Sequence, residues 1–135
     1  MVQEKRPNHI KVRLSKPYFG NKQNLIGLIE DVLNSGLLIQ GKYVSRFEQK
    51  VADYLRVKHG VAVSSGTSAL HLSLIALGIG PGDEVVVPAY TFPATANVVE
   101  LVGAKPVLVD VDLDTFNIRP DHIKEVISPK TKAII

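Results

Sequence analysis

The segment "VAVSSGTSALHLSLIALG", Val61 to Gly78, decides the fold. It opens with a short apolar run typical of a buried strand, and its later leucines recur at the spacing of one helix face. The turn between them, "SSGTS", consists of small residues, most of which carry hydroxyls. A helix that begins there directs unpaired N–H groups and the positive end of its dipole at the turn, and Gly66 lets a ligand approach the backbone. The segment therefore predicts a strand, a turn and a helix that together bind an anion.

The rest of the chain after Gly60 repeats this alternation. Apolar strands are predicted at 84–87 and 106–109, and another strand begins near 132. Helices are predicted over about 93–101 and from Pro120 onward. Strands that are apolar on both faces are typical of a parallel sheet covered by helices on both sides. We therefore predict an α/β fold.

Residues 1–20 differ from the rest of the chain, because they are polar and interrupted by Pro7 and Pro17. We expect them to form an N-terminal arm, and residues 21–135 to form one portion of a larger α/β domain. The last residues, "KAII", have the pattern of a strand whose covering helix is missing. We therefore expect the chain to be a fragment of a longer protein.

Two helices are predicted before the alternation begins. Asn21 is a suitable N-cap for the first, and Gly36 stands where a left-handed residue would end it. In the second, Ser45 and Glu48 have the spacing of a capping box, although the helix could begin a few residues earlier. The loop between these helices is predicted around Gly41.

Charge and composition limit the function classes. Residues 1–60 carry 11 Lys/Arg and 5 Asp/Glu (11 − 5 = +6), whereas residues 61–135 carry 5 and 8 (5 − 8 = −3). No basic run is longer than Lys5-Arg6 and no aromatics are interleaved, so we expect a solvated arm and no nucleic-acid partner. There is no cysteine, no signal-peptide core and no long apolar run, so we expect a cytoplasmic chain without a membrane span.

Other ligand motifs match poorly. There is no P-loop and no dinucleotide-binding turn, because the glycines of 78–82 follow a helix and surround a proline. Asp110, Asp112 and Asp114 alternate as in a calcium loop, but the glycine and glutamate of that loop are missing, so we expect no metal site. His71 is the only histidine near the predicted turn.

The segment "PAYTFPATAN", Pro88 to Asn97, is the second informative loop. In an open parallel sheet, ligands lie outside the carboxyl ends of the strands, and this loop and Ser64–Ser68 both follow predicted strands. Phe92 stands among small polar residues, where its ring could cover a planar ligand or pack onto the sheet. Both interpretations remain open.

The stretch "SSGTSALHLSLIALGIGPGDEVVVPAYTFPATANVVELVGAKPVLVDVD" resembles the N-terminal half of the large domain of the DegT/DnrJ/EryC1/StrS family, the pyridoxal-phosphate-dependent sugar aminotransferases of fold type I. The segments "LSKPYFG", "LNSGLLIQGKYVSRFEQKVADYL" and "VISPKTKAII" are similar to the family's flanking segments. The resemblance implies pyridoxal 5′-phosphate as the cofactor. It implies that the Gly66–Ser68 turn holds the phosphate, through the N–H groups of Thr67 and Ser68 and a hydroxyl of one of them, and that Phe92 stacks on the pyridine ring.

The implied reaction is transfer of an amino group, usually from glutamate, to a keto group of a nucleotide-linked sugar, in surface polysaccharide or deoxyaminosugar biosynthesis. It requires a lysine that binds the cofactor covalently and an aspartate at the pyridine nitrogen, both expected beyond Ile135. None of the eleven lysines stands in the matching motif, so no catalytic residue is assigned and the chain alone is expected to be inactive. Lys42 and Lys105 are expected at the surface.

The resemblance also implies a homodimer with a shared active site, and places the 36–42 loop near the subunit interface or the sugar-nucleotide entrance. Two alternatives remain open. One is a dehydratase of the same fold, in which histidine replaces the covalent lysine. The other is a truncated homologue that acts as a regulatory or interaction module without catalysis.

Overall fold

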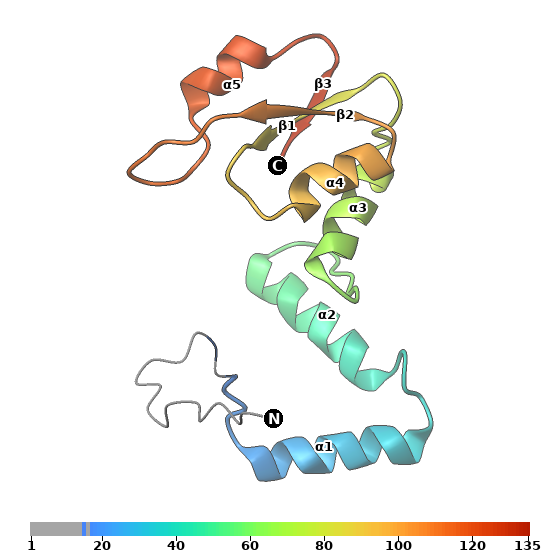
Figure 1. Cartoon of the computed structure of the whole chain (residues 1–135). Coiled ribbons are helices and arrows are strands. Elements are labelled where there is room, and N and C mark those ends of the chain that lie inside the picture. Colours follow the sequence, from blue (N-terminus) through green and yellow to red (C-terminus); the bar gives the residue numbers. More distant parts are fainter. Residues whose placement is uncertain (1–14, 16) are drawn as a thin grey trace, which may run out of the picture. The chain divides into compact units, whose positions relative to one another are not determined.

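The computed structural model describes residues 15 and 17–135 (Figure 1). The predicted arm over residues 1–20 lies mostly outside the described residues, and its boundary stays a prediction. The chain divides into two compact units, one up to Gly60 and one from Val61.

The first unit contains two helices, α1 over Lys22–Ser35 and α2 over Lys42–Leu55. The Asn21 side-chain oxygen accepts a hydrogen bond from the Asn24 N–H at 3.2 Å, so the predicted N-cap is confirmed. Gly36 ends α1 with φ of 69°, the left-handed conformation that favours glycine. Both predicted ends of the first helix are therefore confirmed.

The second helix begins earlier than its capping-box pattern indicates. α2 starts at Lys42, and Gly41 precedes it without a side-chain cap. The Ser45 N–H donates to the Gly41 carbonyl oxygen at 3.2 Å, so Ser45 already lies inside the helix. The Ser45–Glu48 cap is therefore wrong and the earlier start is confirmed.

The second unit is the predicted α/β part. Its elements are α3 (Gly66–Ala76), β1 (Glu84–Pro88), α4 (Ala94–Leu101), β2 (Lys105–Val109), α5 (Pro120–Val126) and β3 (Thr131–Ile134). The three strands form a sheet in the order β2-β1-β3, and β1 is parallel to both neighbours. The predicted parallel sheet with packed helices is confirmed.

The topology explains how the sheet is covered. The chain passes from β1 to β2 through α4, and then returns past β1 to β3 through α5. Right-handed crossovers in opposite directions place the two helices on opposite faces, and Figure 1 shows α4 and α5 on opposite sides of the sheet. Covered in this way, Val85, Val86 and Val87 of the central strand are completely buried.

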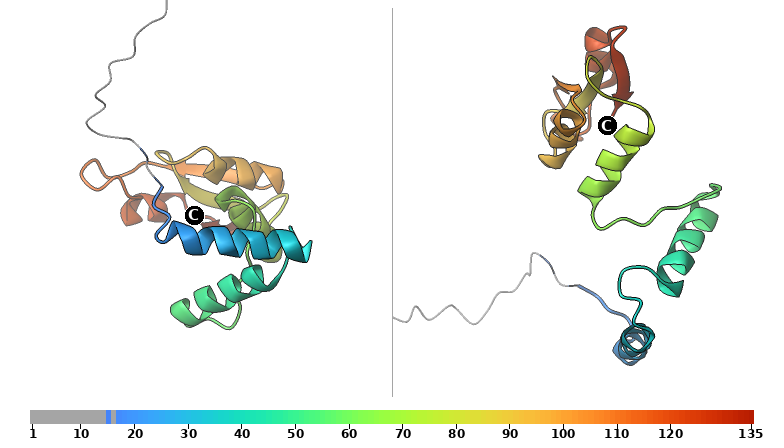
Figure 2. Two further views of the ribbon diagram at one scale, coloured as in Figure 1. Left: turned by 90° about the horizontal axis from the view of Figure 1, so that it is seen from below. Right: turned by 90° about the vertical axis from the view of Figure 1, so that its right-hand side faces the viewer.

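The main core lies between the sheet and α3 and α4. Val85 and Val87 of β1 pack there with Leu74, Ile79, Val98, Val99 and Ala104. Val86, which alternates with them along the strand, points to the other face. Figures 1 and 2 show α3 lying beside α4, and the two helices are in contact.

The predicted strand at Val61–Val63 is wrong as an element of this sheet. Residues 61–63 form no strand, and Val61 is 80% exposed. Both edges of β1 are occupied by β2 and β3, and the sheet of the described residues consists of these three strands. An apolar run shows that a segment is suited to a strand. The segment becomes a strand only where a neighbouring strand has a free edge to pair with it.

Within residues 15 and 17–135, no helix combines the length and the apolar composition needed to cross a membrane.

Candidate cofactor site

The start of α3 presents backbone donors. Ser65 precedes the helix in extended conformation, and its side-chain oxygen accepts a hydrogen bond from the Ser68 N–H at 3.1 Å. In this structure the Ser68 N–H is therefore engaged by Ser65, and its contact with a phosphate stays a prediction. For the N–H groups of Gly66 and Thr67, no acceptor is found in the described part of the chain.

Hydroxyl groups surround these amides. The Ser68 hydroxyl oxygen lies 3.2 Å from that of Ser64 and 3.0 Å from that of Ser65. The first turn of α3 has no acidic residue, and a Cβ built at Gly66 would meet no atom within 4 Å. Open amides, hydroxyls and the positive end of a helix dipole form a donor set that fits a phosphate group.

The loop before α4 presents Phe92. Its carbonyl oxygen accepts a hydrogen bond from the Thr95 N–H at 3.0 Å, and the hydroxyls of Thr91 and Thr95 lie 3.0 Å apart. These bonds fix the C-terminal side of the loop to the helix. The Phe92 side chain is 76% exposed, so it does not pack onto the sheet and its ring face is available to a planar ligand.

The structure places the two predicted parts of the site on neighbouring helices, because α3 packs against α4. It does not join them directly. No hydrogen bond or ring contact between the Ser64–Ser68 turn and Phe92 is found among residues 15 and 17–135. His71 lies half-buried within α3.

The two lysines considered in the sequence are both ion-paired. Lys42 Nζ lies 2.7 Å from Asp31 Oδ2, and this hydrogen bond raises the pKa of Lys42. Lys105 Nζ lies 3.6 Å from Glu84 Oε1. Both lysine side chains are therefore paired with a carboxylate and are largely exposed.

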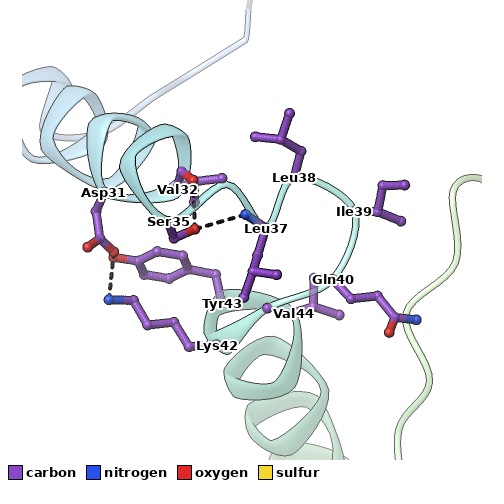
Figure 3. A pocket seen from close by; sticks show the side chains of 11 residues that line it. Asp31, Val32, Ser35, Leu37, Leu38, Ile39, Gln40, Lys42, Tyr43 and Val44 are labelled. Carbon is purple, nitrogen blue, oxygen red and sulfur yellow. Dashed lines mark hydrogen bonds and ion pairs between the residues drawn. The ribbon is translucent and has the colours of Figure 1, made fainter.

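A cavity of about 250 Å³ lies in the first unit, between α1 and the loop that leads to α2. Most of its lining is apolar, as Figure 3 shows for Leu37 and Val44. At its edge the Tyr43 hydroxyl donates to Asp31 Oδ2 at 2.6 Å, beside Lys42. Sequence reasoning missed this cluster, because Asp31 and Tyr43 lie on different helices and share no periodicity.

The loop after β2 forms a turn around Asp112, one of the alternating aspartates considered in the sequence. Asp112 Oδ1 accepts hydrogen bonds from the N–H groups of Asp114 at 3.1 Å and Thr115 at 2.9 Å. These bonds, with that from the Thr115 hydroxyl, lower the pKa of Asp112, the Thr115 backbone contributing most. Phe116, in the same turn, has its ring centroid 5.7 Å from that of Tyr90. The Asp112 carboxylate therefore stabilises the turn after β2.

Comparison with known proteins decides the family. The sequence profile of the DegT/DnrJ/EryC1/StrS aminotransferase family matches residues 21–135. The chain belongs to this family. Membership agrees with the parallel sheet and with the phosphate-type donor set at α3.

Named relatives of this DegT/DnrJ/EryC1/StrS chain include three curated proteins. A pleiotropic regulatory protein of Geobacillus stearothermophilus is 44% identical over 90% of this chain and 33% of its own length. The GDP-perosamine synthase of Caulobacter vibrioides is 53% identical over 70% of this chain and 26% of its own length. A UDP-2-acetamido-2-deoxy-3-oxo-D-glucuronate aminotransferase of Pseudomonas aeruginosa is 46% identical over 79% and 30%. The chain thus spans about a third or less of these relatives.

Solved structures of family members share the fold. A Streptococcus pneumoniae protein, provisionally assigned as a sugar aminotransferase, matches in its pyridoxal-phosphate form with a TM-score of 0.85 and 37% identity, over 91% of this chain and 31% of its own. It is also known in a pyridoxamine-phosphate form and an apo form. A Bacillus subtilis protein with bound pyridoxamine phosphate matches with a TM-score of 0.79 and 42% identity, over 84% and 26%. The fold-type-I class predicted from the sequence is confirmed.

Proposed function

We propose that this chain supplies the phosphate-binding and ring-stacking part of a pyridoxal-phosphate-dependent aminotransferase that acts on a nucleotide-linked keto sugar. The single observation that carries the proposal is the start of α3, where two open amides stand among hydroxyl groups. Family membership supports it, since two family members were solved with the cofactor in bound form.

Each site residue has a role in this proposal. The N–H groups of Gly66 and Thr67, with the hydroxyls of Thr67 and Ser68, hold the phosphate. The exposed ring of Phe92 stacks on the pyridine ring. When bound, the cofactor supplies the electron sink that amino transfer requires. The residues of this chain bind and orient it.

The remaining parts of the proposal concern the reaction and its setting. The names of two relatives support a nucleotide-sugar substrate, because one makes a GDP-linked amino sugar and the other acts on a UDP-linked oxo sugar. We extend the proposal to glutamate as the amino donor, to a role in surface polysaccharide or deoxyaminosugar biosynthesis, and to a cytoplasmic homodimer. A dehydratase of the same fold remains the alternative reaction.

The test uses pyridoxamine 5′-phosphate, whose amine cannot react with lysines and which therefore reports the non-covalent site alone. We expect saturable, weak binding to the 135-residue chain that inorganic phosphate displaces and that unphosphorylated pyridoxamine does not reproduce. Binding that is insensitive to phosphate would contradict the assignment.

A companion experiment examines the covalent link. We expect borohydride treatment with pyridoxal phosphate to leave no stoichiometric adduct on any one of the eleven lysines, and the chain to show no transaminase turnover. A single lysine that is modified completely, and protected by pyridoxamine phosphate, would show that this chain contains the covalent residue.

A regulatory role is the second candidate, favoured by the name of the Geobacillus relative. It predicts that a gene variant whose product does not bind the cofactor still complements a deletion strain. The aminotransferase proposal predicts that complementation is lost.

A further inference from the structure

The turn after β2 holds an aromatic residue in a conformation that bulky residues rarely adopt. Phe116 has φ of 56°, where a side chain crowds the backbone. The turn enforces this conformation, because the Phe116 N–H donates to the Asp112 carbonyl oxygen at 2.8 Å and the Asp112 N–H donates to that of Asn117 at 2.9 Å. An antiparallel bridge between Val111 and Ile118 closes the hairpin. The position of the Phe116 ring is therefore imposed by the turn.

That ring lies against Tyr90. The two ring centroids are 5.7 Å apart and the planes are tilted by 45°, a favourable geometry for an aromatic pair. Because β1 and β2 are parallel, the loops that follow them leave the same edge of the sheet, as Figure 1 shows. Tyr90 is 70% exposed and Phe116 is 60% exposed, so core burial does not explain the contact.

Tyr90 lies between two hydrogen-bonded positions of the loop that carries Phe92. On one side of it, the Ala89 N–H donates to the Val109 carbonyl oxygen at 2.7 Å. On the other side, the Thr91 hydroxyl and the Phe92 carbonyl oxygen are bonded to Thr95 of α4. Between these two positions, the Tyr90 ring is in contact with the Phe116 ring.

We propose that Phe116 is a positioning residue for the cofactor loop: its ring, held by the turn after β2, restrains Tyr90 and thereby sets the orientation of Phe92. The role assigned to Phe92 rests on the proposed function, but the mechanical coupling from Phe116 to Phe92 does not. In this proposal, the loop after β2 supports the loop after β1.

The test replaces Phe116 by glycine. Glycine favours the observed φ, so Phe116→Gly removes the ring and retains the turn. The chain has four phenylalanines and four tyrosines, so selectively labelled rings can be resolved by NMR. We expect the ring protons of both Tyr90 and Phe92 to change chemical shift, and the Phe92 ring to become more mobile. Phe116→Tyr keeps an aromatic ring, so we expect the Tyr90 and Phe92 signals of this variant to match those of the wild-type chain.

Phe47→Leu in α2 is the control, since it removes a similarly exposed ring from the other unit; it should change neither signal. A shift of Tyr90 without any change at Phe92 would overturn the proposal, as would equal effects of the glycine and tyrosine variants.

A measurement of pyridoxamine-phosphate binding by the same variants separates this inference from the proposed function. If both hold, Phe116→Gly weakens pyridoxamine-phosphate binding by about threefold, the scale of one aromatic contact, and Phe116→Tyr does not. If the wild-type chain does not bind the cofactor, the proposed function fails, and the NMR comparison still decides whether Phe116 positions Phe92.

Discussion

The Ser65 hydroxyl oxygen accepts the Ser68 backbone N–H at 3.1 Å, so the chain caps its own candidate phosphate site. The cap satisfies the third amide of α3 and leaves the first two open. We therefore expect a phosphate at this turn to bind the amides of Gly66 and Thr67 before that of Ser68, with the serine hydroxyls completing its contacts.

The cap predicts the effect of removing the Ser65 hydroxyl. We expect Ser65→Ala to lower the free energy of unfolding by about 1 kcal/mol, the usual value of an N-cap side chain. Ser73→Ala is the matched control, because Ser73 lies in the same helix and donates only to the Ala69 carbonyl oxygen. Chemical denaturation followed by circular dichroism measures both. Equal losses in the two variants would argue against a specific cap.

Thr67 is expected to matter for the phosphate and not for the fold. Because its hydroxyl would bind a charged group, Thr67→Ala should weaken pyridoxamine-phosphate binding by about tenfold. His122→Ala in α5, which lies on the other side of the sheet from α4 (Figure 1), should leave the affinity within about twofold. Isothermal titration of both variants checks this, and the same affinity in both would remove Thr67 from the site.

Burial predicts losses of stability of very different size when two valines, Val98 and Val61, are replaced by alanine. Val98 of α4 is completely buried in the core, whereas Val61 is 80% exposed. We expect Val98→Ala to cost about 2 kcal/mol of stability, from lost burial and the cavity that remains. Val61→Ala should cost about 0.5 kcal/mol or less. A large effect at Val61 would show that it packs in solution.

Glu84 supplies the pH prediction. The Ser128 hydroxyl donates to Glu84 Oε2 at 2.7 Å, and this bond, followed by the nearby Lys105, lowers the pKa of Glu84. A carboxylate whose pKa is lowered in the folded state stabilises the fold at pH values above its unfolded-state pKa. This contribution is lost as the pH falls through the folded-state pKa. We expect Ser128→Ala to raise the Glu84 pKa more than Lys105→Met does, as measured by NMR titration. The reverse order would mean that the ion pair dominates.

Much of the fold could be predicted from local signals. Asn21 and Gly36 mark the ends of α1, because a side-chain cap and a left-handed residue act within a few positions of the chain. The apolar run of β1 predicted a strand buried on both faces, and Val85, Val86 and Val87 are so buried. The start of α2 was less certain, because Ser45 suits a cap in isolation but lies inside the helix.

The candidate site was predictable in type and less so in detail. The composition of the Ser64–Ser68 turn predicted an anion-binding helix start, and the family resemblance added the cofactor and chose the stacking role among the two open for Phe92. Pattern reasoning did not weigh Ser65 as a competing acceptor, and the structure shows its hydroxyl oxygen bonded to the Ser68 amide. The Phe116–Tyr90 contact was missed, because it joins loops that only the sheet brings together.

The sequence by itself determined the order of strands and helices after Gly78, the ends of α1, the family and the chemical character of the turn at Gly66. These properties depend on side chains that act on backbone close to them in the chain. Tertiary structure decided whether Val61–Val63 joins the sheet, which amides of α3 stay open, and which ring supports the Phe92 loop. Those outcomes depend on which groups compete for the same partner in space, and residues far apart in sequence settle that competition.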